Sequence, residues 1–86
     1  MTITRRTVAD KIAAYLRHEA TLAQLVDWAE GALMDSDLEE RHAALLGEVL
    51  GRLGVADVRS FGLTWEDCEG LLKQLGYSAR VEIMAA

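Results

Sequence analysis

The sequence predicts a mostly α-helical fold, a compact four-helix bundle around one core that ends in a short C-terminal β-strand. Alanine and leucine, both strong helix formers, occur 13 times each among the 86 residues, and no proline interrupts the chain. Hydrophobic residues make up 51% of the chain, which is enough to fill one small core. We therefore expect residues 1–86 to form a single domain.

The first two predicted helices each begin at a threonine that is followed three residues later by an acid or a glutamine. This spacing is typical of a capping box, in which two side chains close the first turn of a helix. Thr7 and Asp10 predict a helix over residues 7–18, and Thr21 with Gln24 predicts one over 22–34. Apolar residues recur at helical spacing in both segments, so each helix has one face for the core.

The same spacing predicts the other two helices. Ser36 with Glu39 predicts a third helix over residues 37–53, and Thr64 with Asp67 predicts a fourth over 65–75. Gly54 and Gly76 follow these segments, where glycine commonly ends a helix.

The spacing of apolar residues changes from helical to alternating after the fourth helix. Tyr77, Ala79, Val81 and Ile83 alternate with polar residues, which is the pattern of a half-buried strand. A strand needs a partner for its backbone hydrogen bonds. The sequence leaves two partners open: residues 57–61 in parallel, or the same strand of a second chain in an antiparallel homodimer.

The charge of the chain is unevenly distributed. The net charge is −5, but residues 1–18 carry four bases against one acid, whereas residues 27–48 carry seven acids against one arginine. An acidic surface is repelled by phosphate backbones, so we expect no nucleic-acid partner. A basic protein is the partner that such a surface favours, although a solvated helix face would have the same composition.

Trp28 is the candidate anchor of this partner surface. It projects about 100° from the centre of the apolar face of its helix, which places it at the flank. Tryptophan is enriched at binding hot spots, but it is also a common residue at the rim of a core. The predicted partner-binding residues are Asp27, Trp28, Glu30, Asp35, Asp37 and Glu40.

The sequence contains no motif that indicates an enzyme, a metal or a cofactor. There is no Gly-x-Ser-x-Gly, no Walker loop and no Gly-x-Gly-x-x-Gly. Cys68 lies on an apolar stripe among acids, where a thiol acts as a small hydrophobe, and Glu39-x-x-His42 lacks the second such pair of a di-iron site. Without a secretory signal or a long apolar run, we expect a cytoplasmic protein with no membrane contact.

Two stretches resemble small uncharacterised helical bacterial proteins. These stretches are Leu-Val-Asp-Trp-Ala-Glu at 25–30 and Leu-Thr-Trp-Glu-Asp-Cys-Glu at 63–69, the latter followed by Leu75-Gly76-Tyr77. The resemblance covers most of the chain and implies a mostly helical domain, but it carries no activity. We therefore expect a small acidic module for protein–protein interaction that is not an enzyme.

Two alternative functions follow from weaker similarities. Small acidic helical proteins are similar in type to bacteriocin immunity proteins and antitoxins, which implies a basic toxin as partner. The Asp35-Ser36 dipeptide is similar to the phosphopantetheine site of acyl carrier proteins, which implies modification at Ser36. In that family the pattern is Gly-x-Asp-Ser-Leu, and here Leu33 and Asp37 replace the glycine and the leucine.

Overall fold

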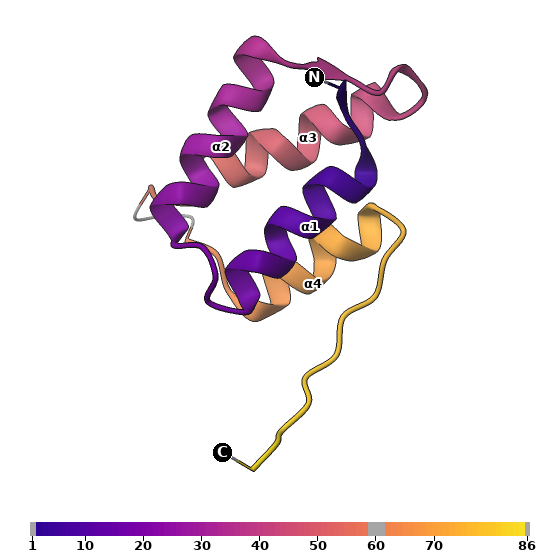
Figure 1. Cartoon of the computed structure of the whole chain (residues 1–86). Helices are drawn as coiled ribbons and strands as arrows, with labels where there is room; N and C mark the ends of the chain where they lie inside the picture. The colour runs from indigo at the N-terminus through magenta and orange to yellow at the C-terminus, as the bar shows by residue number, and fades with distance from the viewer. Residues whose placement is uncertain (1, 59–61, 86) are drawn as a thin grey trace.

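A computed structural model of the chain describes residues 2–58 and 62–85, and within them the protein is mostly helical, as predicted (Figure 1). The described residues form four α-helices, one 3₁₀ turn and two short strands. In chain order these elements are β1 (Thr2–Ile3), α1 (Arg5–Leu16), α2 (Leu22–Asp35), β2 (Asp37–Leu38), η1 (Glu40–His42), α3 (Ala43–Gly54) and α4 (Trp65–Gln74).

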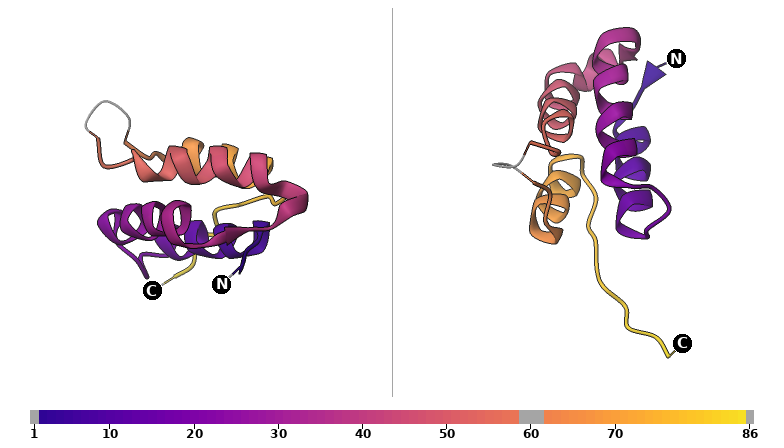
Figure 2. Two further views of the ribbon diagram at one scale, coloured as in Figure 1. Left: turned by 90° about the horizontal axis from the view of Figure 1, so that it is seen from above. Right: turned by 90° about the vertical axis from the view of Figure 1, so that its left-hand side faces the viewer.

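The helices form two layers, with α1 beside α2 in one layer and α3 beside α4 in the other (Figure 2). Contacts across the layers join α2 to α3 and α1 to α4. The core between the layers is built from apolar side chains of all four helices and of β1. Its fully buried large members include Ile3, Val8, Ile12, Leu46, Val49, Leu50, Leu53, Cys68 and Leu75.

Helix α1 begins two residues earlier than predicted. Thr4 is the N-cap, and Thr7 is the third helical residue and not the cap. The Thr4 hydroxyl accepts from the Thr7 amide at 3.2 Å, while the Thr7 hydroxyl accepts from the Thr4 amide at 3.2 Å. A threonine thus serves in the position that glutamate or glutamine usually occupies, so the box is complete without Asp10.

The predicted starts of α2 and α4 are confirmed. Thr21 and Gln24 form a reciprocal capping box, as do Thr64 and Asp67. The hydrogen bonds from Thr64 hold the pKa of Asp67 below its usual value of 3.8, and the Arg52 guanidinium, 3.3 Å away, acts in the same direction. Since Arg52 also donates to the Gly62 carbonyl at 3.1 Å, it ties the end of α3 to the start of α4.

The predicted third helix over residues 37–53 is too long at its N-terminal end. Ser36 follows α2 as its C-cap, and β2, the linking residue Glu39 and η1 come before α3 begins at Ala43. β2 pairs in parallel with β1, with Thr2 opposite Asp37 and Ile3 opposite Leu38. This pairing joins residues far apart in the chain, so the local Ser-x-x-Glu spacing at 36–39 could not reveal it.

The predicted C-terminal β-strand does not form within the described chain. The backbone hydrogen bonds of this region end at Tyr77, whose amide donates to the Leu72 carbonyl at 2.8 Å. Residues 77–85 form no strand and run as an extended trace beyond the helices (Figure 1). The proposed intrachain partner at 57–61 lies partly outside the described residues, and its residues 57 and 58 lie in a turn and a bend after α3. A chain segment that turns here offers no strand edge.

Candidate functional site

The five acids of the predicted partner surface are all exposed. Asp27, Glu30 and Asp35 lie on α2, Asp37 lies in β2 and Glu40 lies in η1. They therefore follow the outer side of α2 and the connection to α3. Carboxylates in such positions are available to a cationic partner, since none of them is enclosed by the core.

Trp28 lies on the α1 flank of α2 and not on this outer side. Its ring is half-buried and packs against the core, and the Lys11 Nζ stands 5.4 Å from the ring centroid. That distance allows a cation–π contact, which covers part of the ring from α1. Glu30 lies toward the other flank of α2, which is next to α3. If a methyl group were added at Gly54 of α3, it would lie 3.5 Å from the Glu30 Cγ. The structure does not bring Trp28 and Glu30 onto one flank.

Met34 is the apolar residue that accompanies the acids. Residues 27, 30 and 34 are spaced by three and four, so Asp27, Glu30 and Met34 share one side of α2. The Met34 side chain is 81% exposed. Sequence reasoning missed it because Met34 ends the apolar run of the helix, although its spacing from Asp27 placed it on the solvent side. We call Asp27, Glu30 and Met34 the outer face of α2.

The C-terminal segment, residues 77–85, carries the other concentration of exposed apolar side chains. Val81, Ile83 and Met84 are 67%, 96% and 80% exposed, whereas Ala79 is half-buried and packs against the core. The segment leaves the end of α4 and extends beyond the helices, so the two termini lie at opposite ends of the molecule (Figure 1). Soluble proteins rarely expose several large apolar residues in succession unless a partner covers them.

The segment also carries an ion pair on the side opposite its apolar residues. Arg80 and Glu82 are two residues apart and their side chains meet at 2.8 Å. In an extended chain, residues two apart point to the same side. The segment therefore has an apolar side with Ala79, Val81 and Ile83 and a charged side with Arg80 and Glu82.

A groove of about 590 Å³ lies between α1, α4 and the first residues of the C-terminal segment. Its apolar lining comes from Ala9, Ala13 and Leu16 on α1 and from Trp65 and Leu72 on α4. We call it the α1–α4 groove. Its volume lies within the range of about 300–1,000 Å³ that holds small molecules or side chains of a partner.

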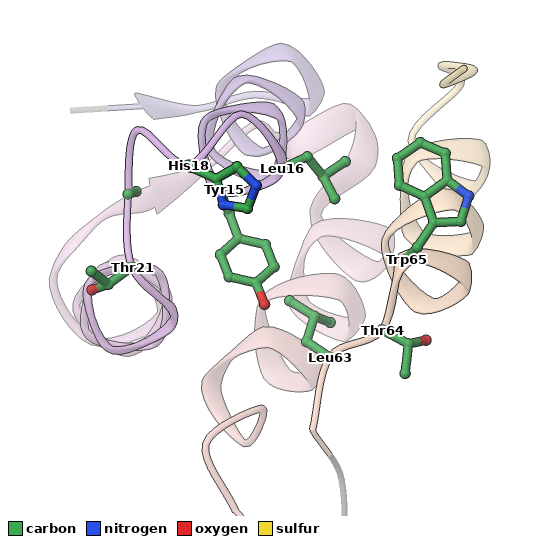
Figure 3. A pocket seen from close by; sticks show the side chains of 8 residues that line it. Tyr15, Leu16, His18, Thr21, Leu63, Thr64 and Trp65 are labelled. Carbon is green, nitrogen blue, oxygen red and sulfur yellow. The ribbon is translucent and has the colours of Figure 1, made fainter. Parts of the chain in front are cut away.

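A second depression of about 380 Å³ lies at the C-terminal end of α1 and shares Leu16 and Trp65 with the α1–α4 groove (Figure 3). Tyr15 points toward Leu63 across it, and His18 stands at its rim. The lining holds no carboxylate and no thiol; besides those three residues it comprises Leu16, Ala20, Thr21, Thr64 and Trp65. The depression therefore offers apolar packing from Leu16, Leu63 and Trp65 and hydrogen-bonding hydroxyl groups from Tyr15, Thr21 and Thr64.

Cys68 and Ser36 are the other side chains with reactive or modifiable groups that the sequence singled out. Cys68 is buried in the core, as predicted, and burial is the main cause that raises the pKa of its thiol to about 11. Such a thiol stays protonated near neutral pH and is a poor nucleophile. Ser36 is half-buried as the C-cap of α2, where its amide donates to the Ala32 carbonyl at 3.3 Å.

The structure adds two observations about metals and membranes. Among residues 2–58 and 62–85, no three His, Cys, Asp or Glu side chains gather closely enough to hold a metal ion. No helix in that part of the chain has the length and apolar character needed to span a bilayer.

No protein-family model, curated protein or solved structure matches the chain.

Proposed function

We propose that this chain is a non-enzymatic protein-interaction module that forms a homodimer through residues 77–85. The observation that carries the proposal is the exposure of Val81, Ile83 and Met84 on one extended segment. Residues 78–85 also have no backbone ladder within the described chain, so their amide and carbonyl groups are available to a strand from another molecule. Burial of the apolar side and satisfaction of these backbone groups both favour association.

Light scattering and sedimentation test this homodimer with a matched pair of variants. Val81→Lys/Ile83→Lys places two charges on the apolar side of the segment, and Val55→Lys/Val58→Lys places two on other exposed valines. We expect a dimer for the wild type and the control and a monomer for the segment variant. A wild-type monomer across the micromolar range would contradict the proposal.

A second candidate function rests on the outer face of α2. Met34, 81% exposed, lies beside Asp27 and Glu30, which pairs an apolar contact with negative charge. Interfaces commonly combine an apolar centre with charges that speed the encounter of the partners. We propose that this face binds a basic protein, as an immunity protein or antitoxin covers a basic toxin.

The test compares two variants of equal net charge. Asp27→Lys/Glu30→Lys reverses the outer face, whereas Glu19→Lys/Glu66→Lys reverses two exposed acids elsewhere. Capture of a partner from the source lysate should be salt-sensitive, should survive the Glu19/Glu66 change and should be lost on the Asp27/Glu30 change. Equal loss in both variants would show that only overall charge matters and would remove the site assignment.

A further inference from the structure

The α1–α4 groove and the outer part of the C-terminal segment are separated within one chain. The groove borders residues 77–82, where the segment still touches the helices. Ile83 lies beyond that contact and is 96% exposed. One chain therefore has a groove beside Ala79, which is apolar along its floor and charged at Arg6, Asp10 and Arg17. It also has an uncovered isoleucine four residues further on, about 13 Å away along an extended strand.

The side of the segment that faces the helices is known from Ala79. Ala79 packs against the core, so the side of residues 79, 81 and 83 is the one that turns toward the helices where the segment runs beside them. A strand that pairs with this segment places directly opposed side chains on the same side of the ladder. A residue opposite Ala79 therefore points toward α1 and α4.

The sequence of the segment is complementary to itself in the antiparallel direction. When two copies pair with Val81 opposite Val81, Arg80 lies opposite Glu82 of the second copy, and Glu82 lies opposite Arg80. A shift by two residues in either direction brings Arg80 opposite Arg80 or Glu82 opposite Glu82. Opposite charges across a strand pair are favourable and like charges are unfavourable, so charge selects the register centred on Val81.

This register brings the outer isoleucine of one copy to the groove of the other. With Val81 opposite Val81, Ile83 of the second copy lies opposite Ala79 and on the side that faces the helices. Two strands alone are marginally stable in water, so a dimer of this kind needs further apolar contact. The groove lined by Ala13, Leu16 and Leu72 supplies that contact.

We propose that Ile83 of a second copy occupies the α1–α4 groove, so that each groove of the homodimer is completed by the partner's C-terminal segment. The proposal rests on the proposed function, because it requires association through residues 77–85. It adds the register of the strands and the occupant of the groove.

Cysteine cross-linking tests the register. Val81→Cys places two thiols opposite each other across the two-fold axis, whereas two Ser78→Cys thiols lie about 20 Å apart in this register. We expect a disulfide-linked dimer for Val81→Cys and at least tenfold less for Ser78→Cys. Arg80→Glu alone should weaken the dimer at least tenfold, and adding Glu82→Arg should restore it. Equal cross-linking at both positions, or no rescue by the double change, would overturn the register.

A mixed cross-link tests the occupant of the groove. One chain carries Ala13→Cys, and a second chain with a size tag carries Ile83→Cys. The control replaces Ala13→Cys by Ala23→Cys, an exposed position on α2 outside the groove. Cys68 is buried and does not compete for the new thiols. We expect the Ala13–Ile83 link between chains to exceed the Ala23–Ile83 link at least fivefold.

The outcomes separate the two proposals. A wild-type monomer would end the proposed homodimer and this inference with it. A dimer in which Val81→Cys cross-links, but the Ala13 and Ala23 chains link to Ile83→Cys equally, would overturn the groove assignment and leave the homodimer in place.

Discussion

β1 and the C-terminal segment are both extended pieces of chain that adjoin a helix, but only β1 has a ladder partner within the described residues. Ile3 in β1 pairs with Leu38 and is 1% exposed, whereas Ile83, a residue of the same type, is 96% exposed. The C-terminal segment has the longer and more regular alternation of apolar and polar residues. Alternation therefore indicates which side of a strand is to be buried, but a ladder forms only where the fold brings a second edge within reach.

Replacement of the two isoleucines gives the largest test of this comparison. Ile3→Ala removes a fully buried side chain from the core and should lower the free energy of unfolding by about 2–5 kcal/mol. Ile83→Ala removes a side chain that its own chain does not cover, so the change should stay within about 0.5 kcal/mol. Urea denaturation at a concentration where the copies are separate measures both. A large loss for Ile83→Ala would show that the segment packs on its own helices.

Gly76, the residue from which the C-terminal segment departs, gives the next largest effect. Its φ of +91° lies in the left-handed region, and an added methyl group would lie 2.9 Å from the Arg5 Nη1. Gly76→Ala should therefore destabilise the chain by about 1–2 kcal/mol.

Gly70→Ala is the matched control. Gly70 lies inside α4 with open space around it, so alanine there should stabilise the protein by about 0.5–1 kcal/mol. Thermal unfolding should separate the two variants in opposite directions. Equal effects would mean that the left-handed backbone conformation of Gly76 does not determine the direction in which the segment leaves α4.

Local signals in the sequence predicted the parts of the fold that local contacts determine. The capping boxes at Thr21 and Thr64 and the glycine at 76 were sufficient because each involves residues within one or two turns. The β1–β2 ladder was missed because it joins Ile3 to Leu38. The free energy of such a pairing depends on both strands together, so neither segment alone indicates it. The same non-local pairing explains why the predicted helix over 37–53 begins only at Ala43.

The candidate site was predictable to a similar degree. The exposure of Asp27 and Glu30 followed from their distance from the apolar stripe of α2. The position of Trp28 under Lys11 depended on how α1 packs beside α2, which no single helix reveals. The α1–α4 groove could not be predicted, because it is formed by three segments that meet only in the folded chain.

The two extended segments differ in how they are attached to their helices, which variants at Thr4 and Ser78 can test. Thr4 follows β1 and caps α1, and Thr4→Ala removes that cap at a cost of about 1 kcal/mol. Ser78 follows Tyr77 on the exposed part of the other segment, so Ser78→Ala should change the free energy of unfolding by less than about 0.5 kcal/mol. Urea denaturation of both single variants provides the measurement, and equal stabilities would show that the Thr4 cap does not anchor β1.

The helix ends after α1 and after α4 share one geometry. After α1, the His18 amide donates to the Tyr15 carbonyl at 3.1 Å and the Glu19 amide to Ala14 at 2.8 Å; after α4, Gly76 and Tyr77 make the equivalent bonds to Lys73 and Leu72. Both ends are thus Schellman motifs, and His18 occupies the left-handed position, φ 63°, that glycine occupies at 76.

His18→Gly should stabilise the chain, because it relieves a left-handed strain of about 1–2 kcal/mol. Glycine also gains conformational freedom in the unfolded chain, which offsets about 0.5–1 kcal/mol of that relief. The expected net gain is about 0.5–1 kcal/mol, measured as a rise in thermal midpoint, with His18→Ala as the control that keeps the strain. If His18→Ala gave the same gain as His18→Gly, the stabilisation would come from loss of the imidazole and not from relief of the backbone. The two helix ends would then share a geometry but not the same backbone strain.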